Sequence, residues 1–152
     1  MSQLQCEIEI AAPRELVYDV VADPNCLHEL VTIQEELEDA PEGDLVPGSH
    51  LRQRMKVAGK RFHLDWTVVE AERPSRIVWE GSGPMRTKAR AVYELSTNGS
   101  GHGTRFSYLN EYRLPGGPAG KVAGGAIARA SGREANRTLE RLRDLVERRA
   151  RE

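Results

Sequence analysis

Alternation of apolar and polar residues with period two recurs between residues 50 and 114 and restricts the fold more than any other feature. It runs through five segments: 50–57, 60–72, 76–81, 89–96 and 103–114. This period is typical of strands with one buried and one wet face. Because short turns such as Ala58-Gly59 join the segments, we expect consecutive strands to pair antiparallel in one sheet.

Seven of the eight aromatic residues lie on four of these strands, at positions of the same parity. They are Phe62, Trp66, Trp79, Tyr93, Phe106, Tyr108 and Tyr112. Positions of the opposite parity repeat Arg and Glu, which can pair across neighbouring strands. The sequence therefore predicts a sheet with one aromatic face and one solvated face.

The remaining segments predict two more strands and three helices. We expect strands at 4–10 and 33–39, a helix opened by Pro13 and stopped by Asp23-Pro24, and a short helix at 25–30. A long helix is expected at 118–150. In its second half Ala135, Leu139, Leu142 and Val146 form a stripe that can lie along the sheet. Residues 1–152 are interpreted as one α+β domain.

The first half of the long helix is unusually poor in side chains. The stretch 114–134 carries Gly116, Gly117, Gly120, Gly124, Gly125 and Gly132. If it lay flat on the aromatic face, small residues would leave gaps that cost about 2–5 kcal/mol each. Two readings stay open: a ligand fills the gap, or the helix backbone approaches the sheet closely and the aromatic residues form an ordinary core.

Polar residues at aromatic-face positions favour a binding pocket. Gln53, Asn110 and the hydroxyls of Tyr93, Tyr108 and Tyr112 share the parity of the apolar set. Buried polar groups need partners. A mostly apolar cavity with a few convergent polar groups is typical of a small-molecule site.

Composition and charge narrow the classes of partner. No stretch approaches the roughly 20 apolar residues of a membrane span, and we expect no stable membrane insertion. With no secretory signal and just Cys6 and Cys26, we expect reduced thiols in a cytoplasmic protein, without metal or cofactor. Residues 1–45 hold twelve acids and one base, whereas 46–152 hold eleven acids and twenty-one bases. Complementary halves on one surface explain this better than nucleic-acid binding, and a homodimer is an alternative.

The whole chain resembles the START-like (SRPBCC, helix-grip) superfamily, in its polyketide cyclase/dehydrase-like branch. The residues that carry the resemblance are "IEIAAPRELVYDVVADP" (8–24), "WTVVEAERPSRIVWEG" (66–81), "GTRFSYLNEYRL" (103–114) and "REANRTLERLRDLVE" (133–147). The resemblance implies a seven-stranded antiparallel sheet curled around the C-terminal helix, two short helices after the first strand, and a deep hydrophobic cavity.

From the residues and the resemblance together, we expect the cavity to bind a small hydrophobic, ring-containing metabolite or lipid. The expected ligand-binding residues are Gln53, Met55, Trp66, Trp79, Tyr93, Phe106, Tyr108, Asn110 and Tyr112. The aromatic rings would stack on the ligand, and Gln53, Asn110 and Tyr112 would orient it.

The alternative is a polyketide aromatase/cyclase- or dehydratase-like enzyme acting in the same cavity. Similar cyclases rely on a pocket arginine, but Arg52, Arg54 and Arg90 fall on the solvated parity here. His28 and Arg86, near the expected cavity mouth, are the other candidates for catalysis. The sequence therefore assigns no catalytic residue.

Overall fold

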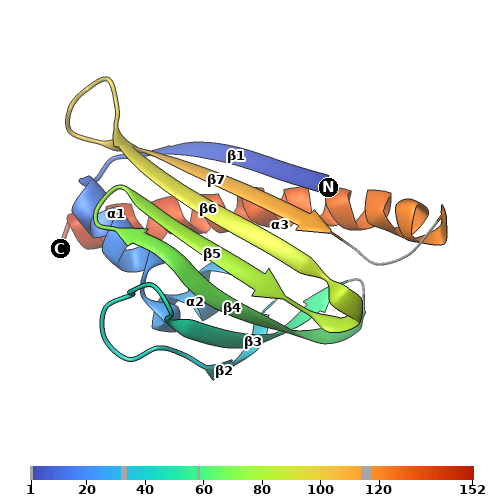
Figure 1. Ribbon diagram of the computed structural model, residues 1–152. Helices are drawn as coiled ribbons and strands as arrows, with labels where there is room; N and C mark the ends of the chain where they lie inside the picture. The colour runs from blue at the N-terminus through green and yellow to red at the C-terminus, as the bar shows by residue number, and fades with distance from the viewer. Residues whose placement is uncertain (1, 32–33, 58, 114–117) are drawn as a thin grey trace.

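Seven antiparallel strands form one sheet in the order β1-β7-β6-β5-β4-β3-β2 in the computed structural model (Figure 1). The structure describes residues 2–31, 34–57, 59–113 and 118–152, and within these it leaves out the side chains of 2, 27, 28, 57 and 118–131. The strands are β1 (Ser2–Ile10), β2 (Gln34–Asp39), β3 (His50–Val57), β4 (Lys60–Glu72), β5 (Arg76–Ser82), β6 (Lys88–Thr97) and β7 (Thr104–Arg113).

The chain crosses from one edge of the sheet to the other through its short helices. Between β1 and β2 lie α1 (Arg14–Val21), the 3-10 turn η1 (Pro24–Cys26) and α2 (Leu27–Leu30). A second 3-10 turn, η2 (Pro84–Arg86), joins β5 to β6. Pro13 caps α1 instead of being its first helical residue, which corrects the sequence expectation by one position.

The long helix α3 (Pro118–Ala150) packs along the sheet and contacts β1, α1 and α2. Figure 1 shows its C-terminal end beside α1 and its N-terminal end at the opposite end of the sheet. The Ala11 amide donates a hydrogen bond to Glu147 Oε1 at 3.2 Å, which ties that C-terminal end to the segment after β1. The predicted helix-grip fold, with its curled sheet and single long helix, is confirmed.

The strand register confirms that all seven aromatic residues lie on one face, here called the inner face. Tyr93 is opposite Tyr108, Leu95 is opposite Phe106, and Trp79 is opposite Ala91. Residues directly opposite one another in a sheet share a face. Continuing the register through β4 and β3 adds Trp66, Phe62, Gln53 and Met55 to the same face.

The second half of α3 supplies the helix side of the core. Leu139, Leu142 and Val146 are buried as the periodicity predicts. Leu145, which the predicted stripe omits, is buried too, whereas Ala135 is half-buried. The apolar stripe is therefore wider than the four predicted residues, because α3 packs against α1 and α2 as well as against the sheet.

The opposite, outer face carries the predicted ion pairs, but two of its valines are buried instead of facing water. Arg76 donates to Glu94 at 2.8 Å and to Glu70 at 3.1 Å. Between such pairs, Val78 and Val92 lie opposite each other and are buried, although their parity predicts that they face water. The flanking ion pairs involve long arginine side chains, whose apolar stems can cover neighbouring apolar surface.

The acidic and basic halves of the sequence meet within one chain. The carboxylate of Glu35 on β2 accepts hydrogen bonds from Arg61 at 2.9 Å and Arg54 at 3.2 Å. Glu9 pairs with Arg105 at 2.8 Å, and Asp19 pairs with Arg73 at 2.9 Å. Further acidic partners from residues 1–45 are Glu36 with Arg54 and Glu38 with His63. These pairs bring acidic side chains from residues 1–45 together with basic side chains from the rest of the chain.

Among the helices that the structure describes, none combines the length and hydropathy needed to cross a membrane.

Gly81 is the position where the inner face depends most directly on the absence of a side chain. A Cβ atom there would lie 2.7 Å from Cε3 and Cζ3 of the Trp66 ring. Gly81→Ala should therefore destabilise the protein by about 1–3 kcal/mol, the usual cost of overpacking. Urea unfolding followed by far-ultraviolet circular dichroism measures this change.

Gly99→Ala is the matched control, because nothing lies within 4 Å of the Cβ that it would add. Its effect should stay within about 0.5 kcal/mol. Equal stabilities of the two variants would show that the Trp66 ring does not depend on the space above Gly81.

Candidate functional site

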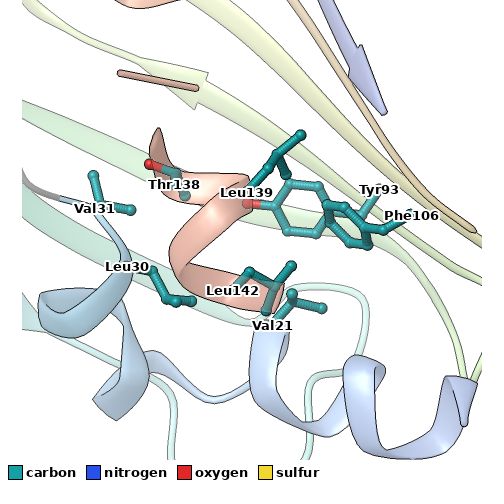
Figure 2. Close-up of a pocket in the computed structure, with 8 residues that line it drawn as sticks. All are labelled: Val21, Leu30, Val31, Tyr93, Phe106, Thr138, Leu139 and Leu142. Atoms are coloured by element: carbon teal, nitrogen blue, oxygen red, sulfur yellow. The ribbon is translucent and has the colours of Figure 1, made fainter. Parts of the chain in front are cut away.

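A cavity of about 50 Å³ lies between the inner face, α3 and the ends of α1 and α2. Its lining residues are Val21, Leu30, Val31, Tyr93, Phe106, Thr138, Leu139 and Leu142. Figure 2 shows the two aromatic rings pointing from the sheet toward the α3 turn that carries Leu139. A cavity thus exists where the sequence places one, between the sheet and the C-terminal helix.

The aromatic wall of this cavity follows from strand pairing. Tyr93 on β6 contacts Phe106 and Tyr108 on β7, with ring centroids 5.7 Å and 5.6 Å apart and the rings tilted. Tilted pairs at this separation are favourable beyond the area that they bury. The three rings therefore support one another and present a stable aromatic surface to α3.

The hydroxyls of Tyr93 and Thr138 are the polar groups among the eight lining residues. Burial raises the pKa of Tyr93 to about 12. Burial also raises the pKa of the neighbouring Tyr108, although a hydrogen bond from the Asn110 side chain opposes part of the rise. Both phenols are therefore protonated at neutral pH and can donate a hydrogen bond.

The volume of the cavity sets a limit on what it can hold unaided. A volume of about 50 Å³ accommodates a few water molecules, whereas an apolar cavity that binds benzene measures about 150 Å³. A ring-containing ligand therefore needs space beyond these eight residues. Next to Tyr93 along β6, the inner face carries the small residues Ala91 and Ala89, so the sheet surface is low there.

Trp66 and Gln53, two of the predicted ligand-binding residues, are hydrogen-bonded to each other. The indole nitrogen of Trp66 donates to Gln53 Oε1 at 2.8 Å, and Gln53 Nε2 donates to Gln34 Oε1 at 2.5 Å. Both polar atoms of the Gln53 amide thus have partners within the chain. This amide holds Trp66 in place and has no donor or acceptor atom without a partner to offer a ligand.

The other predicted residues are placed as follows. Tyr93 and Phe106 line the cavity, and Tyr108 contacts Tyr93 beside it. Trp79, Asn110, Tyr112 and Met55 lie on the inner face but do not line this cavity. The Trp79 indole nitrogen and Asn110 Oδ1 are buried without a hydrogen-bond partner.

Sequence reasoning misses the helical part of the cavity. The predicted lining omits Val21, Leu30, Val31 and Thr138, and the sequence assigns Leu139 and Leu142 to the core. Their helical periodicity gives a signal for burial, but the same spacing fits a packed core and a cavity wall equally well. Which of the two applies depends on the neighbouring elements.

Among the described residues, the candidate catalytic groups do not form an identifiable centre. The His28 side chain lies outside the described part of the chain. Arg86 is exposed, and Arg52 and Arg54 lie on the outer face with acidic partners. Among the described residues, no group of three or more His, Cys, Asp and Glu side chains could hold a metal ion.

Comparison with known proteins identifies the fold and the family. The chain has a TM-score of 0.79 to the Zhui aromatase/cyclase of Streptomyces sp. R1128, at 18% identity over 97% of this chain and 94% of that one. For the protein TTHA0849 of Thermus thermophilus, the TM-score is 0.78 at 21% identity, over 95% and 97% of the two chains. For the protein CV1439 of Chromobacterium violaceum, it is 0.72 at 17% identity, over 97% and 99%.

At these identities the structural matches establish the fold alone. Among proteins with curated functions, none matches this chain. A family model described as "polyketide cyclase / dehydrase and lipid transport" matches residues 1–147. Because this match spans nearly the whole chain, the protein belongs to that family, which is of the SRPBCC type.

Proposed function

We propose that the protein binds a small hydrophobic, ring-containing metabolite or lipid between the inner face of its sheet and α3. The observation that carries this proposal is the cavity walled by Tyr93 and Phe106 on one side and by Leu139 and Leu142 on the other. Aromatic and aliphatic walls with a few hydroxyl groups are typical of pockets for flat apolar molecules.

The ligand extends, in this proposal, from the cavity over Ala91 toward the first half of α3. Ala91 lies two residues from Tyr93 on the same face of β6, between Trp79 on β5 and Asn110 on β7. A ring lying over Ala91 contacts larger side chains on both sides. Ala91 is 4% exposed, so a ring placed there requires α3 to move away from the sheet.

The charge of the inner face favours a neutral ligand. On β1, β7, β6 and β5, the positions that share this face carry no Asp, Glu, Lys, Arg or His within the described residues. An ionised group placed against these strands would lose its hydration without gaining a countercharge. The proposed ligand therefore carries its polar groups as hydroxyls or carbonyls.

A second candidate function is a cyclase- or dehydratase-like reaction in the same cavity. The observation that favours it is the pair of protonated phenols, Tyr93 and Tyr108, with ring centroids 5.6 Å apart. A buried phenol can protonate a developing enolate. Binding alone requires fewer groups than catalysis, and we rank it first.

Filling the cavity should abolish binding. Leu139→Trp places an indole where the cavity lies. It should lower the affinity for the neutral fluorescent probe N-phenylnaphthylamine at least tenfold, because the probe and the new ring compete for one volume. A fluorescence titration measures the loss, and circular dichroism establishes that the variant folds.

Val69→Trp is the control, because it adds the same side chain at an exposed position of β4. It should bind the probe as the parent protein does. Unchanged binding by Leu139→Trp, or no binding by the parent protein, would contradict the proposed site.

The protonated phenols predict a late alkaline titration. An unfolded tyrosine ionises near pH 10, whereas Tyr93 in the folded protein has a pKa of about 12. Stability from this difference is fully present below pH 10 and is lost as the pH rises toward 12. Absorbance at the phenolate band should show a late-ionising component that Tyr93→Phe reduces. Ionisation of all four tyrosines in one step near pH 10 would contradict the burial of these hydroxyls.

A further inference from the structure

Five exposed basic side chains gather at the end of the sheet where α3 begins. They lie beside the β3–β4 turn, on the β5–β6 loop, at the start of β6 and at the end of β7, and Figure 1 shows these segments together at that end. Among the described residues, none of the five has an acidic side chain within ion-pairing distance. The five, here called the basic end, are Lys56, Lys60, Arg86, Lys88 and Arg113.

The opposite end of the sheet carries arginines of similar exposure that do have acidic partners. Arg73 in the β4–β5 turn pairs with Asp19 at 2.9 Å, and Arg105 at the start of β7 pairs with Glu9 at 2.8 Å. The two arginine side chains are 53% and 55% exposed. Exposure alone therefore does not account for the unpaired bases of the basic end in the described part of the chain.

Two acids near the basic end have their charges offset by other arginines. The Glu35 carboxylate on β2 accepts hydrogen bonds from Arg61 and Arg54. Glu111 on β7 lies directly opposite Arg90 on β6, where opposite charges attract. The positive charge of the basic end is therefore left to attract an anionic partner from outside the chain.

Strand register places two of the five bases directly opposite each other. Lys88 begins β6, Arg113 ends β7, and the two are register partners. Side chains at such positions are about 5 Å apart at Cβ, and like charges placed there destabilise the sheet. An anionic group bound between them would remove this repulsion.

The same end presents Met85, the most exposed large apolar side chain of the described residues, at 77%. The backbone of Met85 and of Arg86 is left-handed, with φ of 56° and 64°, which residues with a side chain rarely adopt. Beneath them the Gly83 amide donates to the Thr87 carbonyl at 3.0 Å, and the Thr87 amide donates to the Pro84 carbonyl at 3.1 Å. A closed, strained turn thus presents Met85 to solvent, and strain of this kind is typical of segments with a functional role.

One apolar side chain among unpaired bases fits the surface of an anionic lipid bilayer. Apolar side chains enter the boundary between headgroups and acyl chains, while lysine and arginine side chains bind the anionic headgroups. An acidic protein would also attract the bases, but it gives no reason for the exposed methionine. The bilayer accounts for both observations.

We propose that the basic end and Met85 form a docking surface for an anionic lipid bilayer. Met85 enters the headgroup region, and the five bases contact lipid phosphates. Docking is peripheral and reversible, because one methionine buries far less apolar surface than stable anchoring needs. This inference goes beyond the proposed function, since it requires no ligand in the cavity.

Vesicles of defined composition test the proposal on the parent protein. Each base near an anionic bilayer strengthens binding about fivefold, so vesicles with about 30% phosphatidylserine should bind at least a hundredfold more tightly than phosphatidylcholine alone. Raising NaCl from about 0.1 M to about 0.5 M should weaken the binding, because salt screens exposed charges. Flotation measures both effects. Equal binding to the two compositions would overturn the proposal.

Substitutions assign the binding to this end of the sheet. Arg86→Asn combined with Lys88→Gln should lower the affinity for the anionic vesicles at least tenfold. Arg73→Gln combined with Arg105→Gln is the matched control, because it removes the same charge from the opposite end, and it should bind as the parent protein does. Circular dichroism establishes that both variants fold. Equal losses in the two double variants would overturn the proposal.

The role of the methionine has its own pair of variants. Met85→Asn should lower the affinity about fivefold, because it removes the apolar side chain and asparagine tolerates the left-handed backbone. Val46→Asn is the control, since it removes a side chain that is 56% exposed on the connection between β2 and β3. Equal affinities of Met85→Asn and the parent protein would contradict entry of Met85 into the bilayer.

A fluorescence measurement locates position 85 directly. The indole of Met85→Trp should be quenched by lipids brominated on their acyl chains, beyond the quenching of the parent protein, whereas that of Val46→Trp should not. Equal quenching of the two variants would overturn the proposed orientation.

A polyglutamate peptide represents the competing partner, an acidic protein. Binding of this peptide without binding of anionic vesicles would overturn the bilayer as the partner. Because the vesicles carry no ring-containing ligand, that result would leave the proposed function of the cavity intact.

Discussion

The whole architecture depends on how one helix covers a sheet that carries all of its aromatic rings on a single face. Strand register places seven rings on the inner face. Exposing that apolar surface to water is unfavourable, so α3 must cover it. The helices α1 and α2, which connect β1 to β2, contact α3 and cover part of it as well. The ion pairs of the outer face stabilise the opposite surface in water.

The packing of α3 against its neighbours differs along its length. At the C-terminal end, Val146 is fully buried and packs in the same core cluster as Val17 and Ile10. Toward the middle, Leu139 and Leu142 belong to the same core cluster and also line the cavity. Farther along the sheet, Trp79 and Asn110 carry polar atoms without partners among the described residues. The cavity is therefore a gap within the core, and the function that we propose depends on it.

Much of this could be predicted from the sequence, because strand parity and helical spacing are local properties. The alternating segments, the aromatic face and the long helix all follow from them. The strand order does not follow from local patterns, since β1 pairs with β7 across some hundred residues and β2 pairs with β3 through two irregularities in register. For the same reason the sequence could not show that Gln53 is engaged by Trp66 and Gln34 while Trp79 is not. Parity gives the face of a side chain but not its partner.

The function that we propose requires a small molecule in the cavity between Tyr93, Phe106 and the turn of α3 that carries Leu139. A crystal structure of the protein, purified without denaturation and refined at atomic resolution, shows whether one is there. We expect non-protein electron density, larger than water, in contact with the Tyr93 and Phe106 rings. Leu139 and Leu142 packed directly against those two rings, with no density between them, would rule the site out.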